Sequence, residues 1–108
     1  MLGGYTGSIL KVNLTKRTAE MEKLDEKIAR KFIGGKGLGA KILYDFIKPG
    51  IDPFSPENLL IFASGPLTAT LAPSSARSAV VTKSPLTGIF LDTQFGGFFG
   101  VEMKLAGF

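Results

Sequence analysis

Glycine and proline residues divide this chain of 108 residues into short segments, and this spacing limits what the chain can fold into. The clearest breaks are the dipeptides Gly34-Gly35, Pro49-Gly50, Gly65-Pro66 and Gly96-Gly97. Both residue types destabilise the interior of helices and strands and are common where such elements end. The sequence therefore predicts several short helices and strands, and a chain of this length has room for one domain.

The first half of the chain predicts a hairpin followed by two helices. Residues 10–14 and 19–22 alternate apolar and polar side chains, as strands do, and a short turn joins them. Asp25 is a typical N-cap for a helix that would end at Gly34-Gly35. The apolar face of this helix would consist of Ile28, Ala29, Phe32 and Ile33. A second helix follows and ends before Pro49-Gly50.

The second half predicts three strands and one more helix. Residues 59–63 are a continuous apolar run, which is typical of a strand buried on both faces. Residues 78–82 and 89–93 flank a turn and predict a strand pair. A short helix follows Gly96-Gly97. Together these elements predict an α+β fold class, a β-rich mixed-sheet domain with short helices.

The chain contains no cysteine and no histidine. It therefore lacks disulfides, thiolate metal ligands and the usual nucleophile and base pairs, which argues against a self-contained hydrolase, transferase or metalloenzyme. No apolar run reaches about 18 residues and no signal peptide is present, so we expect no membrane partner and a cytoplasmic location. Acidic residues interleave with the basic ones, so no nucleic acid partner is expected.

Charge is unevenly distributed along the chain. Residues 51–108 hold only three of the thirteen Lys and Arg but seven of the nine Phe. A half with so few charges and so many aromatic rings predicts surface that something else covers, and self-association when the chain is isolated. The chain stops at Phe108, directly after the helix-ending Gly107, which we interpret as a domain truncated at its C-terminal end.

Three segments could bind an anion. In the first, residues 34–40, Gly35, Gly37 and Ala40 have the spacing of a dinucleotide-binding turn. That turn requires a preceding strand, whereas a helix is predicted here. A tight turn between two helices and a direct phosphate contact therefore stay open as alternatives for this segment, and a small nucleotide-binding module is disfavoured.

The second and third segments follow later in the chain. Residues 72–77 are a loop of small residues that ends in Arg77, whose planar guanidinium suits a phosphate but could equally bond loop carbonyls. Residues 92–100 place Gln94 and Phe95 before Gly96-Gly97 and a helix start, where free backbone N–H groups favour an anion. The Phe rings of this segment could flank a planar ligand or pack in the core.

Several motifs together resemble the N-terminal part of aldehyde ferredoxin oxidoreductases. The motifs occur in the order seen in that family and cover almost the whole chain. They are residues 7–15 (GSILKVNLT), 32–38 (FIGGKGL), 53–58 (PFSPEN), 65–68 (GPLT), 82–88 (TKSPLTG) and the stretch from Gly96-Gly97 to Gly107.

The resemblance implies a tungsten or molybdenum pterin enzyme that oxidises aldehydes to carboxylic acids and passes electrons through an iron–sulfur cluster to ferredoxin. It implies that residues 1–108 are a cofactor-binding N-terminal domain, half of a saddle-like β-rich domain. By this likeness Arg77 would hold a pterin phosphate and Gln94, Phe95, Gly96 and Gly97 would bind the cofactor. The backbone oxygen of Gln94 would hold a magnesium ion that bridges phosphates.

Two consequences of the resemblance follow from what the chain lacks. The cluster ligands of such enzymes are cysteines in later domains, so these 108 residues alone are not expected to be active. Gln94-Phe95 stands where the family usually has Asn-Ser, which leaves the subfamily and the substrate open. The alternative function is a non-catalytic truncated or stand-alone domain that acts in assembly with other polypeptides.

Overall fold

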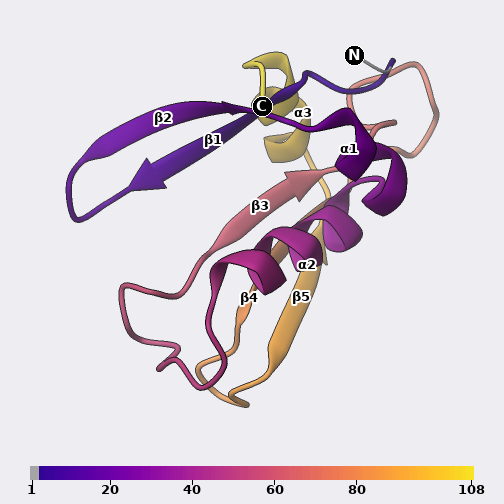
Figure 1. Cartoon of the computed structure of the whole chain (residues 1–108). Helices are drawn as coiled ribbons and strands as arrows, with labels where there is room; N and C mark the ends of the chain where they lie inside the picture. The colour runs from indigo at the N-terminus through magenta and orange to yellow at the C-terminus, as the bar shows by residue number, and fades with distance from the viewer. Residues whose placement is uncertain (1–2) are drawn as a thin grey trace.

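The computed structural model describes residues 3–108 and shows an α+β fold with two small sheets and three helices in that range (Figure 1). The α+β prediction is therefore confirmed. In chain order the elements are β1 Ser8–Asn13, β2 Thr18–Lys23, α1 Glu26–Phe32, α2 Gly35–Phe46, β3 Ile61–Ser64, β4 Ser78–Lys83, β5 Phe90–Phe95 and α3 Phe99–Leu105. Every strand pair within residues 3–108 is antiparallel, so the sheets are not mixed, because each pair is joined by a turn or loop that reverses the chain.

Strands β1 and β2 form the predicted hairpin, which extends away from the rest of the molecule (Figure 1). In its register Leu10 lies opposite Met21, on one face of the hairpin. Both side chains are exposed, as are nearly all others of the two strands. The hairpin contacts α2 where the Lys11 ammonium lies 4.8 Å from the centre of the Phe46 ring at the end of that helix.

Helix α1 begins and ends as the sequence indicates. The Asp25 carboxylate accepts a hydrogen bond from the Lys27 N–H at 2.7 Å and caps the helix. The chain leaves the helix at Ile33 with a φ of 67° and reverses at Gly34 into α2. The assignment of Ile33 to the buried apolar face is wrong, because this change of backbone direction leaves its side chain 60% exposed.

Helix α2 covers one face of a three-stranded sheet with the order β3-β4-β5. The core between them consists of Leu43, Ala79 and Val81, with Ile47, Leu59 and Ile61 packed around it. The prediction of a strand buried on both faces at residues 59–63 is wrong. Strand β3 is an edge strand, and α2 covers only one face of it, so Phe62 on the other face is 45% exposed.

Loops fix both ends of the sheet. At one end Asn58 donates to the Pro53 carbonyl at 2.9 Å and the Lys83 carbonyl at 3.1 Å, which joins the proline-rich loop to the end of β4. At the other end of the sheet lies α3, the last helix of the chain, and Gly107 ends this helix with a φ of 104°. The Phe108 N–H then donates to the Met103 carbonyl at 3.2 Å, a typical glycine-ended helix terminus.

Candidate functional site

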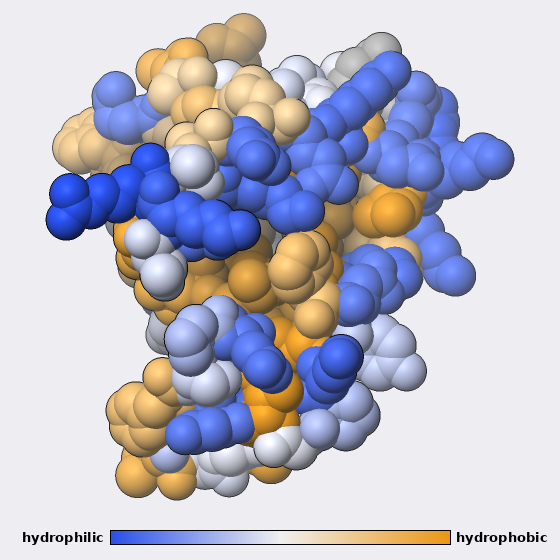
Figure 2. All heavy atoms as spheres, turned by 60° about the vertical axis from the view of Figure 1, so that its left-hand side comes forward, coloured by the Kyte–Doolittle hydropathy of each residue, from blue (hydrophilic) through white to orange (hydrophobic). Residues whose placement is uncertain are grey.

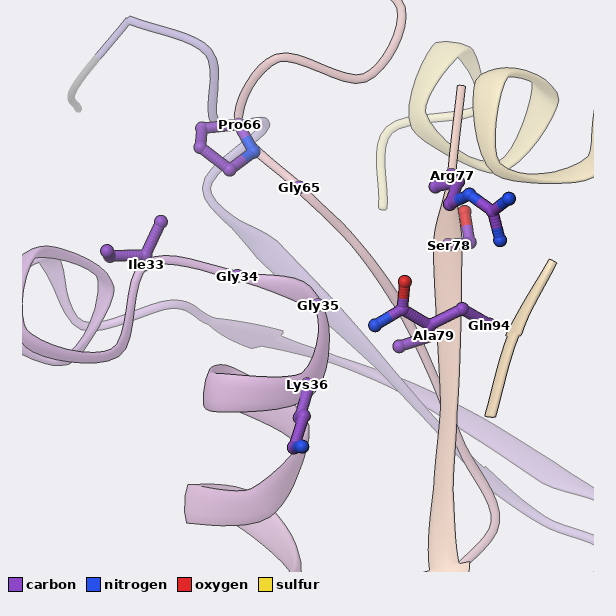
Figure 3. A pocket seen from close by; sticks show the side chains of 10 residues that line it. All are labelled: Ile33, Gly34, Gly35, Lys36, Gly65, Pro66, Arg77, Ser78, Ala79 and Gln94. Carbon is purple, nitrogen blue, oxygen red and sulfur yellow. The ribbon is translucent and has the colours of Figure 1, made fainter. Parts of the chain in front are cut away.

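A hollow of about 200 Å³ lies where α2 begins, β4 begins and β5 ends (Figure 3). Four separate parts of the chain meet there because β4 lies between β3 and β5 and because α2 runs over the sheet. Its lining residues are Ile33, Gly34, Gly35, Lys36, Gly65, Pro66, Arg77, Ser78, Ala79 and Gln94. The hollow therefore unites the first, second and third candidate segments.

The turn between the two helices forms one wall of the hollow. A Cβ at Gly34 would lie 2.9 Å from the Ser64 carbonyl oxygen and 3.1 Å from the Gly65 Cα. This close approach requires glycine at position 34. The prediction of a tight helix–helix turn is confirmed, and α1 rather than a strand precedes it, which excludes the dinucleotide-binding arrangement. No side chain caps α2, so its first N–H groups stay available to an anion.

Gln94 and Arg77 come from neighbouring strands at the opposite wall. Ala79 pairs with Gln94 in the β4–β5 ladder, and Arg77 lies two residues before Ala79. Figure 3 shows the Gln94 amide pointing into the hollow toward Gly35, whereas the Arg77 guanidinium points away from the glycine turn. Arg77 is exposed and forms no ion pair with a carboxylate of residues 3–108. It is a cation at the rim with its charge uncompensated.

Lys36 also lines the hollow, although no separate role was predicted for it. Its ammonium lies 3.4 Å from the Asp92 carboxylate, two residues before Gln94 on β5. Its side chain is 58% exposed, so this ion pair is a weak surface interaction. The glycine motif drew attention to Lys36 in the sequence. The ion pair could not be predicted, because it depends on where the start of α2 lies relative to β5 in the fold.

The remaining predicted residues do not line the hollow. Phe95 points to the other side of the sheet, where its ring centre lies 5.6 Å from that of Phe99 in α3. Gly96 and Gly97 follow β5, are exposed, and have open space where a Cβ would stand. Because Phe95 pairs with Ser78, they leave the sheet beside Arg77. The structure shows Phe95 packed against α3, and its contact with the cofactor stays a prediction.

Gly65 and Pro66 complete the lining of the hollow, although neither residue was predicted to bind a ligand. They directly follow β3, and their carbonyl oxygens accept hydrogen bonds from the Lys104 ammonium of α3 at 2.8 Å and 3.0 Å. Partial burial lowers the pKa of Lys104, because the charged form loses water contacts there. Two signals were available, their position at the end of a predicted strand and their place in the motif of residues 65–68, but neither indicated binding.

Residues 3–108 contain no cluster of three or more carboxylate, His or Cys side chains that could hold a metal ion. Among the same residues, no helix has the length and apolar character needed to cross a membrane. The magnesium contact expected at the Gln94 backbone oxygen stays a prediction.

Comparison with known proteins identifies the family. The sequence profile described as "Aldehyde ferredoxin oxidoreductase, N-terminal domain" matches residues 9–108. This chain belongs to that family. A tungsten-containing aldehyde ferredoxin oxidoreductase from Pyrococcus abyssi is 52% identical over 104 residues, which cover 96% of this chain and 17% of the relative.

Two other relatives act on different substrates by their names. An aliphatic sulfonate oxidoreductase, WOR-like subunit, from Pyrococcus furiosus is 34% identical over 107 residues, which cover 96% of this chain and 17% of the relative. The solved active-site complex BamBC of benzoyl coenzyme A reductase, in complex with 1,5-dienoyl-CoA, is 44% identical with a TM-score of 0.96. That match covers 100% of this chain and 16% of the other. The chain thus spans about a sixth of the proteins that it matches.

Proposed function

We propose that this chain is the cofactor-binding N-terminal part of a tungsten or molybdenum pterin oxidoreductase that oxidises aldehydes to carboxylic acids. Electrons would pass to ferredoxin. The observation that supports this most is the hollow, where the Gln94 amide and the start of α2 face space for an anion, and where Arg77, which forms no ion pair with a carboxylate of residues 3–108, stands at the rim. The identity of 52% to an aldehyde enzyme, against 34% to the sulfonate enzyme and 44% to the benzoyl coenzyme A reductase, favours an aldehyde substrate.

The residues at the hollow fit a phosphate group. Arg77 supplies a planar cation, and no carboxylate of residues 3–108 competes for it. A hollow of about 200 Å³ suits a phosphate-sized group rather than a whole pterin. The exposed Gly96 and Gly97, without side chains, leave room for the rest of the cofactor beside Arg77.

The chain's own part in the reaction would be binding and orientation. When bound, the metal–pterin group supplies the two-electron oxidation chemistry. Arg77 would hold its phosphate, Gln94 would orient it, and the Gln94 backbone oxygen would help to hold a magnesium ion. An iron–sulfur cluster needs thiolate ligands, so residues outside this chain would hold it, because the chain has no Cys.

The partners that we propose are the pterin cofactor, the remaining domains of the same enzyme, and ferredoxin. A second candidate is a non-catalytic domain that acts by assembly with other polypeptides. The observation that favours assembly is the number of large apolar side chains at the surface, which Figure 2 shows between the hydrophilic groups on one face. Leu71, Leu86 and Leu14 are among the most exposed.

The test is cofactor content in the full-length protein. An Arg77→Met variant should lose tungsten or molybdenum and pterin in parallel, because a buried phosphate would be left without its charge-assisted hydrogen bonds. Arg30→Met is the matched control, since Arg30 pairs with Glu26 on α1 and does not line the hollow. Equal content in Arg77→Met and the unmodified protein would show that Arg77 is structural.

Activity with purified ferredoxin separates the two candidate functions. If the protein is an oxidoreductase, the full-length protein should reduce ferredoxin in the presence of an aldehyde, and residues 1–108 alone should not. An immunoblot of the native protein gives the length of the polypeptide in the cell. A native chain of the length of this sequence, without metal or pterin, would favour the assembly function.

A further inference from the structure

Thr68 is one of the most deeply buried polar residues among residues 3–108, with 2% of its surface exposed. Its hydroxyl oxygen accepts a hydrogen bond from the Gly65 N–H at 3.2 Å and donates one to the Arg77 carbonyl at 3.3 Å. One side chain thus joins the turn after β3 to the residue that precedes β4. Both joined residues line the hollow.

The loop between these two joined points has little other support. Its own side-chain hydrogen bonds are local: Thr70 donates to the Leu67 carbonyl and Ser75 to the Ala72 carbonyl, each three residues away. The bond from Thr68 to Arg77 spans nine residues and therefore closes the loop. Leu71 at the far end of the loop is fully exposed. The backbone of Arg77 is therefore held by Thr68 and by the strand that begins at Ser78, which pairs with Ser64 and Phe95, rather than by the loop itself.

The turn that contains Gly65 is itself held from two sides. On one side the Lys104 ammonium donates to the carbonyls of Gly65 and Pro66, and hydrogen bonds from a charged donor are stronger than neutral ones. On the other side Gly34 lies so close that a Cβ would meet the Pro66 Cδ at 3.1 Å. The turn is thus fixed on two sides, and Thr68 joins it to Arg77, the residue that precedes β4.

We propose that Thr68 is a positioning residue for Arg77, and that Lys104 supports it by fixing the Gly65-Pro66 turn. Thr68 sets the Arg77 backbone so that the guanidinium can meet the cofactor phosphate at the rim of the hollow. This inference rests on the proposed function of Arg77.

The experiment measures how fast the full-length enzyme loses metal and pterin on dialysis, per folded protein. Thr68→Val keeps the shape of the side chain and removes both hydrogen bonds. We expect loss about three- to tenfold faster than in the unmodified enzyme, the factor that corresponds to one net hydrogen bond. Thr68→Ser keeps the hydroxyl and should restore slow loss.

Thr82→Val is the matched control. The Thr82 hydroxyl donates to the Leu59 carbonyl at 2.6 Å at the other end of β4, away from the hollow. The two Thr→Val changes remove the same group and should destabilise the fold alike, so only cofactor loss should differ. Equal rates in the two variants would overturn the proposal, because Thr68 would then act only on stability.

A double variant tests whether Thr68 acts through Arg77. In the Arg77→Met background, Thr68→Val should speed the loss no further, because the contact that it positions is already absent. Additive effects would overturn the positioning role and leave the proposed function of Arg77 standing. An unaltered rate in Arg77→Met alone would overturn the proposed function itself, and the positioning role with it.

Variants of Lys104 provide a second test of the proposal, which applies even when Thr68→Val does not fold. Lys104→Met keeps the aliphatic stem and removes the two bonds to the turn, whereas Lys104→Arg keeps a charged donor. We expect faster cofactor loss in Lys104→Met and rescue in Lys104→Arg. Loss at the unmodified rate in Lys104→Met would show that the turn does not need this support.

Discussion

Gly39 of α2 lies against Val81 of β4, so closely that a Cβ on Gly39 would be 2.8 Å from the Val81 Cγ2. The helix rests on the sheet at this point, and Val81 is fully buried there. This single approach sets the distance between α2 and the sheet. It therefore also sets the width of the hollow, which α2 and β4 share.

Gly39→Ala should destabilise the fold by about 1–3 kcal/mol, because overpacking against Val81 outweighs the gain in helix propensity. Denaturant unfolding of the purified protein measures the change in the free energy of unfolding. Gly3→Ala is the control, since nothing lies within 4 Å of a Cβ at that position. A more stable Gly39→Ala variant would mean that α2 can move away from the sheet.

Asn58→Ala should destabilise the fold by about 1–3 kcal/mol, because several partly buried backbone groups lose their partner. The Asn58 amide donates to Pro53 and Lys83, and its oxygen accepts from the Leu59 N–H at 2.9 Å. Thermal unfolding measures the effect. Asn13→Ala, which removes one exposed turn bond to the Lys16 N–H, should cost much less.

Lys104 predicts a pH dependence of stability. Because burial lowers its pKa in the folded state, the unfolded chain binds more protons than the folded one between the lowered pKa and the usual value. The contribution of Lys104 to stability should therefore rise as the pH increases through that window. The free energy of unfolding of the unmodified protein, minus that of Lys104→Met, measures it. A difference that falls with pH would contradict the lowered pKa.

Lys36→Ala should leave metal and pterin content unchanged within about twofold, since an exposed ion pair contributes little. Its ammonium lies 3.4 Å from the Asp92 carboxylate and points away from the side of the hollow where Arg77 stands. Metal and pterin per folded protein, after circular dichroism confirms the fold, give the answer. A loss confined to the Lys36 variant would place the phosphate at the start of α2.

The 108 residues produced alone should self-associate or bind a hydrophobic dye. Leu60 and Phe62 on the face of the sheet away from α2 are exposed, as are Phe98 and Phe99 of the adjoining segment. Apolar patches of more than a few hundred Å² favour association. Light scattering tests this directly, and a monomer at high concentration that binds no dye would contradict it.

Local patterns predicted the elements well where the backbone itself carries the signal. The hairpin, the Asp25 cap and the turn at Gly34-Gly35 follow from residue types that act within a few positions. The reading of residues 59–63 failed because burial depends on which elements lie over a strand. An apolar run does not say whether a second layer is present in the same chain.

The candidate site shows the same division. Arg77 and Gln94 lie in separate segments that only the family resemblance assigned to one cofactor, and their position at one hollow depends on the β4–β5 register, which pairs Ala79 with Gln94. Phe95 was expected at the cofactor, and alternation along β5 places its side chain on the face opposite the hollow, which the sequence analysis did not specify. Thr68 belongs to the motif of residues 65–68, but its role was not predicted, since that role arises from two hydrogen bonds across a folded loop.

The exposed arm of β1 and β2 has a consequence for measuring the molecule in solution. A hairpin of two strands without a covered face is only marginally stable by itself. Its backbone amides should therefore exchange their hydrogens with solvent far faster than those of β4, which lies in the centre of its sheet. Slow exchange in residues 8–23 would then indicate that another protein surface covers the hairpin. Hydrogen exchange in the hairpin therefore measures whether the domain is assembled with a partner surface.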